Sequence, residues 1–344
     1  MTTAPSPPPL ALTMGEPAGI GGDIALKAWS RRNAKTPAFF LIDDPARLRV
    51  LAERLGLKVP VVEIASADEA AGRFADSLPV LAEPLVVPVT PGRPDPANSA
   101  AVTASIRRAV ELTLAGQARA VVTNPIHKEV MYQGGFAFPG HTEYLASLMA
   151  DRLAETGGRE VMMLACPGLR VVPVTIHVPL RDAVRDLRQG DIVAIGRITA
   201  RALVTDFGIP APRLAVAALN PHAGENGTMG REEIDIIAPA VADLKARGID
   251  AFGPLPADTL FHPAARAGYD AVLCMYHDQA LIPLKTIDFD GGINVTLGLP
   301  IVRTSPDHGT AFGLAGTGRA SETSLMAALD AAAAIADNRR RHHG

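Results

Sequence analysis

The amino-acid sequence predicts an α/β protein built on parallel strands, and three features support this prediction. Short apolar runs alternate with longer stretches of helical period along the chain. Glycines and prolines are scattered among the turns and do not gather in one linker. Histidines follow several of the apolar runs directly, at the positions where parallel strands of an open sheet border a ligand crevice. Parallel strands joined by crossover helices are the default topology for such an alternation.

The expected strands are short, and the expected helices lie between them. The strand candidates are LALTM, AFFLI, VPVVEI, AVVT, VMMLA, VVPVTI, RLAVAAL and DAVLCMY, in chain order. Helical period is clearest over 99–114, 191–206 and 232–247, and several helical stretches close with a glycine near the last turn. A final helix is expected between 320 and 341, followed by a basic end that is either frayed or functional.

The chain length and the first residues indicate how many domains to expect and where the folded part begins. A chain of 344 residues exceeds the usual size of one core, so two packed lobes or one large α/β domain are expected within residues 10–344, with uncertain boundaries. Residues 1–9 are rich in proline and lack a basic segment followed by an apolar one. We therefore expect a disordered tail there and no signal peptide.

Composition excludes several classes of protein. Hydrophobic residues make up 48% of the chain and charged residues 20%, which is typical of a globular protein. The net charge of −3 and the lack of a long basic run argue against nucleic acid as a partner. No apolar run approaches the roughly 20 residues that span a bilayer. The two cysteines, Cys166 and Cys274, lie in or beside apolar runs and are expected to be reduced, so a cytoplasmic enzyme is predicted.

Three histidines share one local setting. His177, His222 and His277 each come after an apolar, strand-like run. Because strand ends border the ligand crevice of an open α/β sheet, the three imidazoles could meet there. Three neutral imidazoles make a good site for a divalent metal, although a hydrogen-bonded structural role is about as common for any one of them. Nitrogen ligands favour zinc, cobalt, nickel or iron over magnesium, and the identity of the metal stays open.

A second group of residues could bind an anion. The segment from Gly140 to Glu143 opens a helical pattern, and free backbone amides at a helix start suit a phosphate. A helix cap alone would also explain Thr142. Lys285, Asn294 and Arg303 supply further cationic and amide donors, so a phosphate or carboxylate clamp is predicted.

The glycine-rich segments give mainly negative evidence. No G-x-G-x-x-G follows the first strand, and no G-x-x-x-x-G-K-[ST] occurs in the chain. A standard Rossmann site and a P-loop are therefore disfavoured. GEPAGIGGD is either an active-site turn or a plain strand-to-helix turn, and DHGTAFGLAGTG is a weak signal by itself.

A set of longer motifs resembles a known family. The motifs are GEPAGIG, NPIHK, GHTE, NPHAGENGTMG, GPLPADT, MYHDQ, NVTLGLPIVRTS and DHGTAFGLAG. In this order, from about Leu10 to Ala328, they strongly resemble the 4-hydroxythreonine-4-phosphate dehydrogenase family of vitamin B6 biosynthesis. The resemblance implies an isocitrate/isopropylmalate-dehydrogenase-like fold, with two α/β lobes, a cleft between them and a homodimer whose active site lies at the interface.

The resemblance also implies roles for individual residues. It makes the three histidines named above metal ligands shared across the dimer interface, with zinc, cobalt or magnesium as the ion. It places His141, Thr142, Lys285, Asn294 and Arg303 at a phosphorylated substrate. It puts the C-terminal HGTAFGLAG segment beside NAD or NADP, and the cofactor-binding candidates there are His308, Gly309, Thr310, Gly313 and Gly316.

The implied reaction is the oxidation of 4-phosphooxy-L-threonine at its C3 hydroxyl, followed by loss of carbon dioxide to give 3-amino-2-oxopropyl phosphate. Lys285 and Asp258 are candidates for the general base, and the sequence does not choose between them. Two rival enzymes are weighed against this one. The nearer rival is a related dehydrogenase of 4-phospho-threonate, 4-phospho-erythronate or a cyclic dihydrodiol carboxylate, and the remoter one is a phosphate acyltransferase. A third hypothesis is a metabolite-binding protein without catalytic activity.

Overall fold

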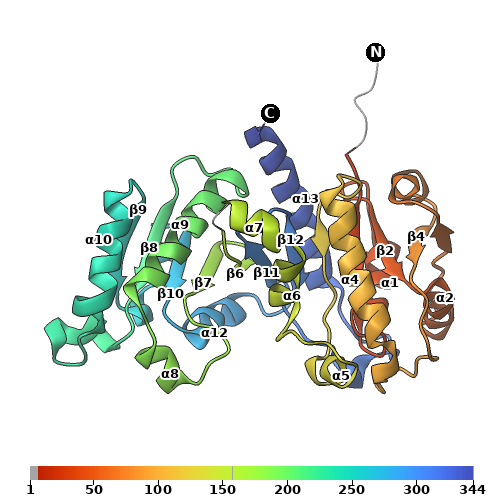
Figure 1. Ribbon diagram of the computed structural model, residues 1–344, viewed down its shortest axis with the longest axis horizontal. Helices are drawn as coiled ribbons and strands as arrows, with labels where there is room; N and C mark the ends of the chain where they lie inside the picture. The colour runs from red at the N-terminus through yellow and green to blue at the C-terminus, as the bar shows by residue number, and fades with distance from the viewer. Residues whose placement is uncertain (1–6, 157, 344) are drawn as a thin grey trace, which may run out of the picture. The chain divides into compact units, whose positions relative to one another are not determined.

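The computed structural model describes residues 7–156 and 158–343, and the chain divides into two compact units. Unit 1 comprises residues up to 157 together with 299–336, and unit 2 comprises 158–298 together with 337–344. The two units are therefore interleaved along the sequence. Helices alternate with strands in both of them (Figure 1), so the predicted α/β class is confirmed. Of the predicted tail, residues 1–6 lie outside the described residues and residues 7–9 form neither helix nor strand.

The sheet of unit 1 follows the predicted parallel topology. Its strands pair in the order β3 (Val61–Ile64), β4 (Leu78–Ala82), β2 (Phe39–Asp43), β1 (Leu10–Thr13), β5 (Val121–Val122) and β12 (Arg303–Pro306). Every neighbouring pair among them is parallel. The central strands β1 and β2 are apolar almost without interruption and buried at every position, as expected for strands covered on both faces.

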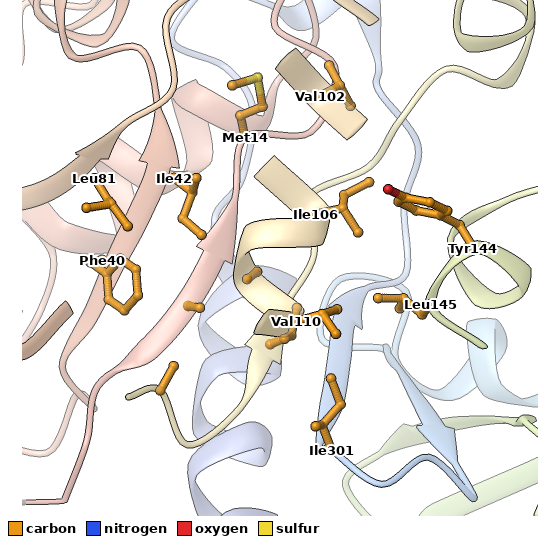
Figure 2. Packing of buried hydrophobic residues seen from close by; sticks show 14 of the residues in the cluster. Met14, Phe40, Ile42, Leu81, Val102, Ile106, Val110, Tyr144, Leu145 and Ile301 are labelled. Atoms are coloured by element: carbon orange, nitrogen blue, oxygen red, sulfur yellow. The ribbon is translucent and has the colours of Figure 1, made fainter. Parts of the chain in front are cut away.

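Helix α4 carries the main apolar face of unit 1. The helices of this unit are α1 (Gly21–Ser30), α2 (Pro45–Arg54), α3 (Ala70–Arg73), α4 (Ser99–Leu114), α5 (Lys128–Gln133), α6 (His141–Leu148), α7 (Ala150–Thr156) and the first part of α13 (Thr323–His343). Val102, Ile106 and Val110, which lie one turn apart on α4, are buried in one core cluster with side chains of the sheet and of α6 (Figure 2).

The sheet of unit 2 departs from the all-parallel expectation. Its strands pair in the order β11 (Ile293–Leu297), β6 (Val161–Cys166), β7 (Leu169–Pro173), β10 (Ala271–Cys274), β8 (Arg213–Ala217) and β9 (Asp250–Leu255). The pairs β11–β6 and β6–β7 are antiparallel. Only Pro167 and Gly168 separate β6 from β7, and a connection this short can only form a hairpin. The strands β7, β10, β8 and β9 are mutually parallel, as predicted.

The remaining helices belong to unit 2. They are α8 (Leu180–Arg185), α9 (Gln189–Thr205), α10 (Ala238–Ala246), α11 (Pro263–Arg266) and α12 (His277–Ile287). The sequence predicted two of them, α9 and α10. In Figure 1 α10 lies along α9 and β9, with which it is in contact. The helix expected over 232–247 begins with a π-helical turn, Glu233–Ile237, before α10. Within the described part of the chain, no helix combines the length and the apolar character needed to cross a bilayer.

Candidate functional site

The three histidines singled out by the sequence follow three adjacent parallel strands of unit 2. His177 follows β7, His222 follows β8 and His277 follows β10, and these strands are neighbours in the order β7, β10, β8. Parallel neighbours end at the same edge of a sheet, so all three histidines come from segments that leave one edge. This edge is where an α/β sheet offers a ligand site.

The turn that carries His222 has an unusual backbone. His222, Ala223, Glu225 and Asn226 all have positive φ angles, between 45° and 56°, which side chains other than glycine rarely adopt. Glu233 holds the start of this turn, because its Oε1 accepts hydrogen bonds from the backbone amides of Leu219 and Asn220 at 2.8 and 2.7 Å. Although burial alone would raise the pKa of Glu233, hydrogen bonds from Asn220 and the backbone lower it, so this carboxylate is ionised at neutral pH.

His177 and His277 lie close together. Their ring centroids are 5.7 Å apart, His177 has a φ of 44°, and Nδ1 of His277 lies 2.7 Å from Oδ1 of Asp278. A carboxylate on one imidazole nitrogen is the usual way to orient a ring whose other nitrogen binds a metal. Two neighbouring imidazoles, one of them held by a carboxylate, are of the residue type that binds divalent ions.

The third predicted ligand is not beside the other two in one chain. Across residues 7–156 and 158–343, no three His, Cys, Asp or Glu side chains lie close enough together to hold a metal ion. The side chain of Gln279, on α12, joins two of the strand ends. Its Oε1 accepts from the amide of Met275, and its Nε2 donates to the carbonyl of Ala218 at 2.7 Å, so it ties the end of β10 to the end of β8.

Unit 1 contains the core of the predicted anion site. Helix α6 begins at His141, and the residue before it is Gly140, which has no side chain that could cap the helix. The capping-box explanation of Thr142 is therefore wrong. Arg303, on β12, is 4% exposed, and its guanidinium donates to the hydroxyl of Thr123 at 2.6 Å. Arg303 also acts on His141, because its positive charge disfavours protonation of the imidazole and so lowers the pKa of His141.

Burial controls the protonation of both groups. Burial and the nearby charges of Arg303 and Lys128 lower the pKa of His141 to about 3, so its imidazole is neutral at physiological pH. Burial lowers the pKa of Arg303 to about 10, which leaves the guanidinium charged. The Nε2 atom of His141 is buried and has no hydrogen-bond partner within the described residues. An anion would compensate the buried charge and could also bond to this nitrogen.

Acid is expected to destabilise the protein partly through His141. Between its ordinary pKa of 6.5 and its folded value of about 3, the unfolded chain binds a proton that the folded chain does not. This contribution to stability is thus complete above pH 6.5 and decreases as the pH falls toward 3. His141→Gln should show a shallower decline of Tm between pH 7 and pH 4 than the wild type. Equal slopes would contradict the burial of a neutral histidine.

The other predicted substrate residues lie in unit 2. Lys285 is on α12, with its Nζ 5.3 Å from the ring centroid of Phe289. Asn294 is on β11, and its Oδ1 is buried without a hydrogen-bond partner among the described residues. Asp258 lies in a short turn after β9 and is exposed.

The predicted cofactor segment follows β12 in unit 1. His308, Gly309 and Thr310 lead into a short helical turn, Phe312–Leu314, and Ala311 before it has a φ of 43°. The carbonyl of Thr310 accepts from Ile20 at 3.0 Å, and the amide of Gly316 donates to Asp23 at 2.8 Å. Both contacts attach the segment to the start of α1, so the C-terminal glycines lie against the GEPAGIGGD turn.

The sequence analysis missed two buried groups beside these two segments, His127 and Glu16. Nδ1 of His127 is buried with no hydrogen-bond partner in the described part of the chain, and its ring lies 5.0 Å from that of Phe312. Glu16 is 3% exposed, and burial raises its pKa although the charge of His127 opposes this. The signal was the motif NPIHK, which follows β5 just as the other histidines follow their strands.

The strand order defines an α/β protein with histidines after three neighbouring parallel strands of unit 2 and the buried guanidinium of Arg303 in unit 1. Residues 35–332 match the family model described as pyridoxal phosphate biosynthetic protein PdxA. The chain is 54% identical over 340 residues to 4-hydroxythreonine-4-phosphate dehydrogenase of Bradyrhizobium diazoefficiens, which covers 95% of this chain and 97% of that protein.

Solved structures agree with these sequence comparisons. The crystal structure of 4-hydroxythreonine-4-phosphate dehydrogenase from Klebsiella pneumoniae matches with a TM-score of 0.84 and 38% identity, covering 96% of this chain and 99% of that one. A terephthalate 1,2-cis-dihydrodiol dehydrogenase from Burkholderia xenovorans matches with a TM-score of 0.62 and 27% identity, covering 95% and 99%. The chain belongs to the PdxA family of pyridoxal phosphate biosynthetic proteins, and it is a dehydrogenase.

Proposed function

We propose that the chain oxidises the C3 hydroxyl of 4-phosphooxy-L-threonine, with NAD or NADP as the hydride acceptor, in pyridoxine 5′-phosphate biosynthesis. The product is a β-keto acid that loses carbon dioxide and leaves 3-amino-2-oxopropyl phosphate. The observation that carries the proposal is the coupled pair of His141 and Arg303, in a chain 54% identical to a relative named for a phosphorylated hydroxythreonine.

The substrate's phosphate is assigned to this buried pair. Arg303 offers a charged guanidinium in a site where burial disfavours the charge, so a phosphate dianion there gains a strong hydrogen-bonded contact. His141 stays neutral and can donate one N–H without adding a second desolvated charge. Thr142, next to His141 on α6, adds a hydroxyl. Lys285 and Asn294, in unit 2, stay predicted substrate-binding residues.

A divalent metal is assigned to the three strand-end histidines. The donors fit, because imidazole nitrogen suits zinc or cobalt, and His277 has the carboxylate neighbour that metal-binding histidines commonly have. Magnesium, a hard cation that prefers oxygen ligands, is the alternative. When bound, such an ion supplies Lewis-acid polarisation of oxygen atoms. His177 and His277 come from one chain, and we assign His222 of a second copy as the third ligand.

Exposed apolar side chains support a homodimer with the metal at its interface. Val178 and Leu180 follow His177, Met229 follows His222, and Ile282 and Phe289 follow His277. All five are at least 49% exposed. Large exposed apolar side chains on the segments that hold a predicted site indicate a covered surface. A second copy of the chain is the occupant that would also provide a histidine.

The cofactor is assigned to the segment of unit 1 that contains His308, Gly309, Thr310, Gly313 and Gly316. A nicotinamide cofactor accepts the hydride when it is bound. The proton of the C3 hydroxyl needs an acceptor, and Lys285 and Asp258 are the candidates.

A comparison of substrates tests the proposed function. Purified protein with divalent metal should reduce NAD or NADP with 4-phosphooxy-L-threonine and release carbon dioxide in equal amount. We expect kcat/KM for this substrate to exceed that for 4-phospho-threonate at least a hundredfold, because the site must bind the amine. A preference for the amine-free acid would contradict the substrate assignment while leaving the enzyme class intact.

One observation favours a second candidate substrate. The structure of a terephthalate dihydrodiol dehydrogenase matches nearly the whole chain, so a cyclic dihydrodiol carboxylate belongs in the same assay. That substrate carries carboxylates and no phosphate. Inorganic phosphate should therefore compete with 4-phosphooxy-L-threonine, and turnover of the dihydrodiol with no effect of phosphate would favour the second candidate.

A further inference from the structure

Unit 1 contains a pocket that no part of the proposed mechanism uses. It has a volume of about 500 Å³ and lies between the start of α1, the helix α2 and the segment 85–91. Its size falls in the range of ordinary small-molecule sites. Its lining includes Asp23, Val50, Leu51, Arg54, Val86 and Val87.

The pocket has one unsatisfied polar group. Asp23 lines it, is 1% exposed, and uses Oδ1 to accept a hydrogen bond from the amide of Gly316 at 2.8 Å. Its Oδ2 is buried and has no hydrogen-bond partner among residues 7–156 and 158–343. A buried carboxylate oxygen without a partner is costly, so a ligand that donates a hydroxyl to it is strongly favoured.

The walls of the pocket are apolar and open to solvent. Val50 on α2 is 66% exposed and Val86 is 71% exposed, whereas Leu51 beneath them is buried. A flat ring that binds against exposed branched apolar side chains removes their surface from water, which stabilises the complex. A ligand for this site therefore combines an aromatic ring system with hydroxyl donors.

The charges around the pocket are already partly neutralised. The guanidinium of Arg47 is held by the buried carboxylate of Asp43, with Nε to Oδ1 at 2.8 Å and Nη2 to Oδ2 at 2.6 Å. Arg54 is exposed, and its Nε donates to the carbonyl of Gly316 at 3.0 Å. Asp44 also lines the pocket, but both of its oxygens accept hydrogen bonds from backbone amides. Asp23 is thus the lining carboxylate that has an oxygen available to a ligand, and Arg54 lies at the edge of the pocket.

The pocket adjoins the segment assigned to the cofactor. Gly316 contacts both Asp23 and Arg54, and a Cβ placed on Gly316 would lie 2.8 Å from Nε of Arg54 and 2.9 Å from Pro91. A Cβ on Gly92 would similarly lie 3.0 Å from the carbonyl oxygen of Phe312. The glycines let the two segments touch, so one ligand can extend from the loop after β12 into the pocket.

We propose that this pocket binds the adenosine part of the nicotinamide cofactor, with the adenine ring against Val50 and Val86 and a ribose hydroxyl on Oδ2 of Asp23. This inference rests on the proposed dehydrogenase function. The chain lacks the Rossmann glycine motif, so its dinucleotide needs another site. An acidic side chain on the adenosine ribose accepts from its hydroxyls and repels a 2′-phosphate. The site therefore selects NAD over NADP.

Binding of cofactor fragments tests the proposal without relying on turnover. Calorimetry on the full-length protein should detect ADP-ribose, and Val50→Trp, which fills the pocket mouth from an exposed position, should weaken this binding at least tenfold. Glu53→Trp is the matched control, because it adds the same bulk to an exposed residue of α2 that does not line the pocket. Equal loss in both variants, or in neither, would overturn the location.

Asp23→Asn tests the role of the carboxylate. Asparagine keeps the oxygen that accepts from Gly316 and removes the negative charge. The wild type should bind ADP-ribose at least tenfold more tightly than 2′-phospho-ADP-ribose, and Asp23→Asn should bring the two affinities close together. A ratio unchanged by the substitution would overturn the assignment of the ribose.

The two proposals can fail separately. Normal reduction of NAD with 4-phosphooxy-L-threonine, together with unchanged ADP-ribose affinity in Val50→Trp, would reject the pocket and keep the dehydrogenase function. Pocket-dependent binding of ADP-ribose without turnover of any tested hydroxy acid would keep the pocket and reject the proposed substrate.

Discussion

Replacing His222 by alanine is expected to abolish the metal-dependent activity and leave the fold intact. The side chain is exposed on its turn, and Glu233 holds that turn through Leu219 and Asn220, so no core volume is lost. Removing one of three imidazole ligands weakens metal binding by orders of magnitude. We expect kcat to fall at least a thousandfold and zinc or cobalt affinity, measured by calorimetry, to fall in parallel. Full activity in the presence of trace metal would contradict the assignment.

Mixed dimers would show whether the third ligand comes from a second copy. His222→Ala and His277→Ala should each be inactive alone. If His177 and His277 of one subunit share a metal with His222 of the partner subunit, a mixed dimer contains one intact site and one site lacking two ligands. Random mixing makes half of the dimers mixed, so about a quarter of the wild-type activity should return. No recovery after verified subunit exchange would place all three ligands in one chain.

Replacing Arg303 by methionine is expected to remove the substrate's phosphate contact without weakening the fold. Because burial lowers the pKa of Arg303, the folded protein disfavours this charge, and an apolar side chain of similar length should leave Tm unchanged or raise it. Loss of a buried charged contact to an anion costs about 2–5 kcal/mol, which corresponds to a fall in kcat/KM of roughly thirtyfold to several thousandfold.

A conservative variant provides the control for Arg303. Arg303→Lys keeps the charge but loses the planar guanidinium that donates to Thr123, so it should regain only part of the lost kcat/KM. Inorganic phosphate should inhibit the wild type and Arg303→Lys but not Arg303→Met. Equal inhibition of all three proteins by phosphate would move the phosphate site elsewhere.

The sequence predicted several of the elements that carry the candidate residues because its signals are local. The helix over 99–114 has the bounds of α4, and the helix predicted to open at GHTE begins at His141. The three strand-end histidines follow strands, as the apolar runs before them indicated. In each case the period of the apolar residues or a single turn residue carries the information, and neither depends on the rest of the chain.

Other features depended on contacts between distant segments, which a sequence pattern does not report. The short β6–β7 connection forces an antiparallel hairpin, yet the pairing of β11 with β6 joins segments more than a hundred residues apart. The lowered pKa of His141 arises from burial and from Arg303 on another strand. His127 and Glu16 were overlooked for the same reason, since only packing reveals that they are buried.

The sequence by itself therefore determined the α/β class, the strand ends that carry histidine, and the residue types available for metal and anion binding. The tertiary structure decided which strands are neighbours, which charges are desolvated, and that Asp23, beside a largely apolar pocket, has an oxygen with no hydrogen-bond partner among the described residues. The physical reason is that period and turn chemistry act over a few residues, whereas burial and electrostatics depend on all the segments packed around a group.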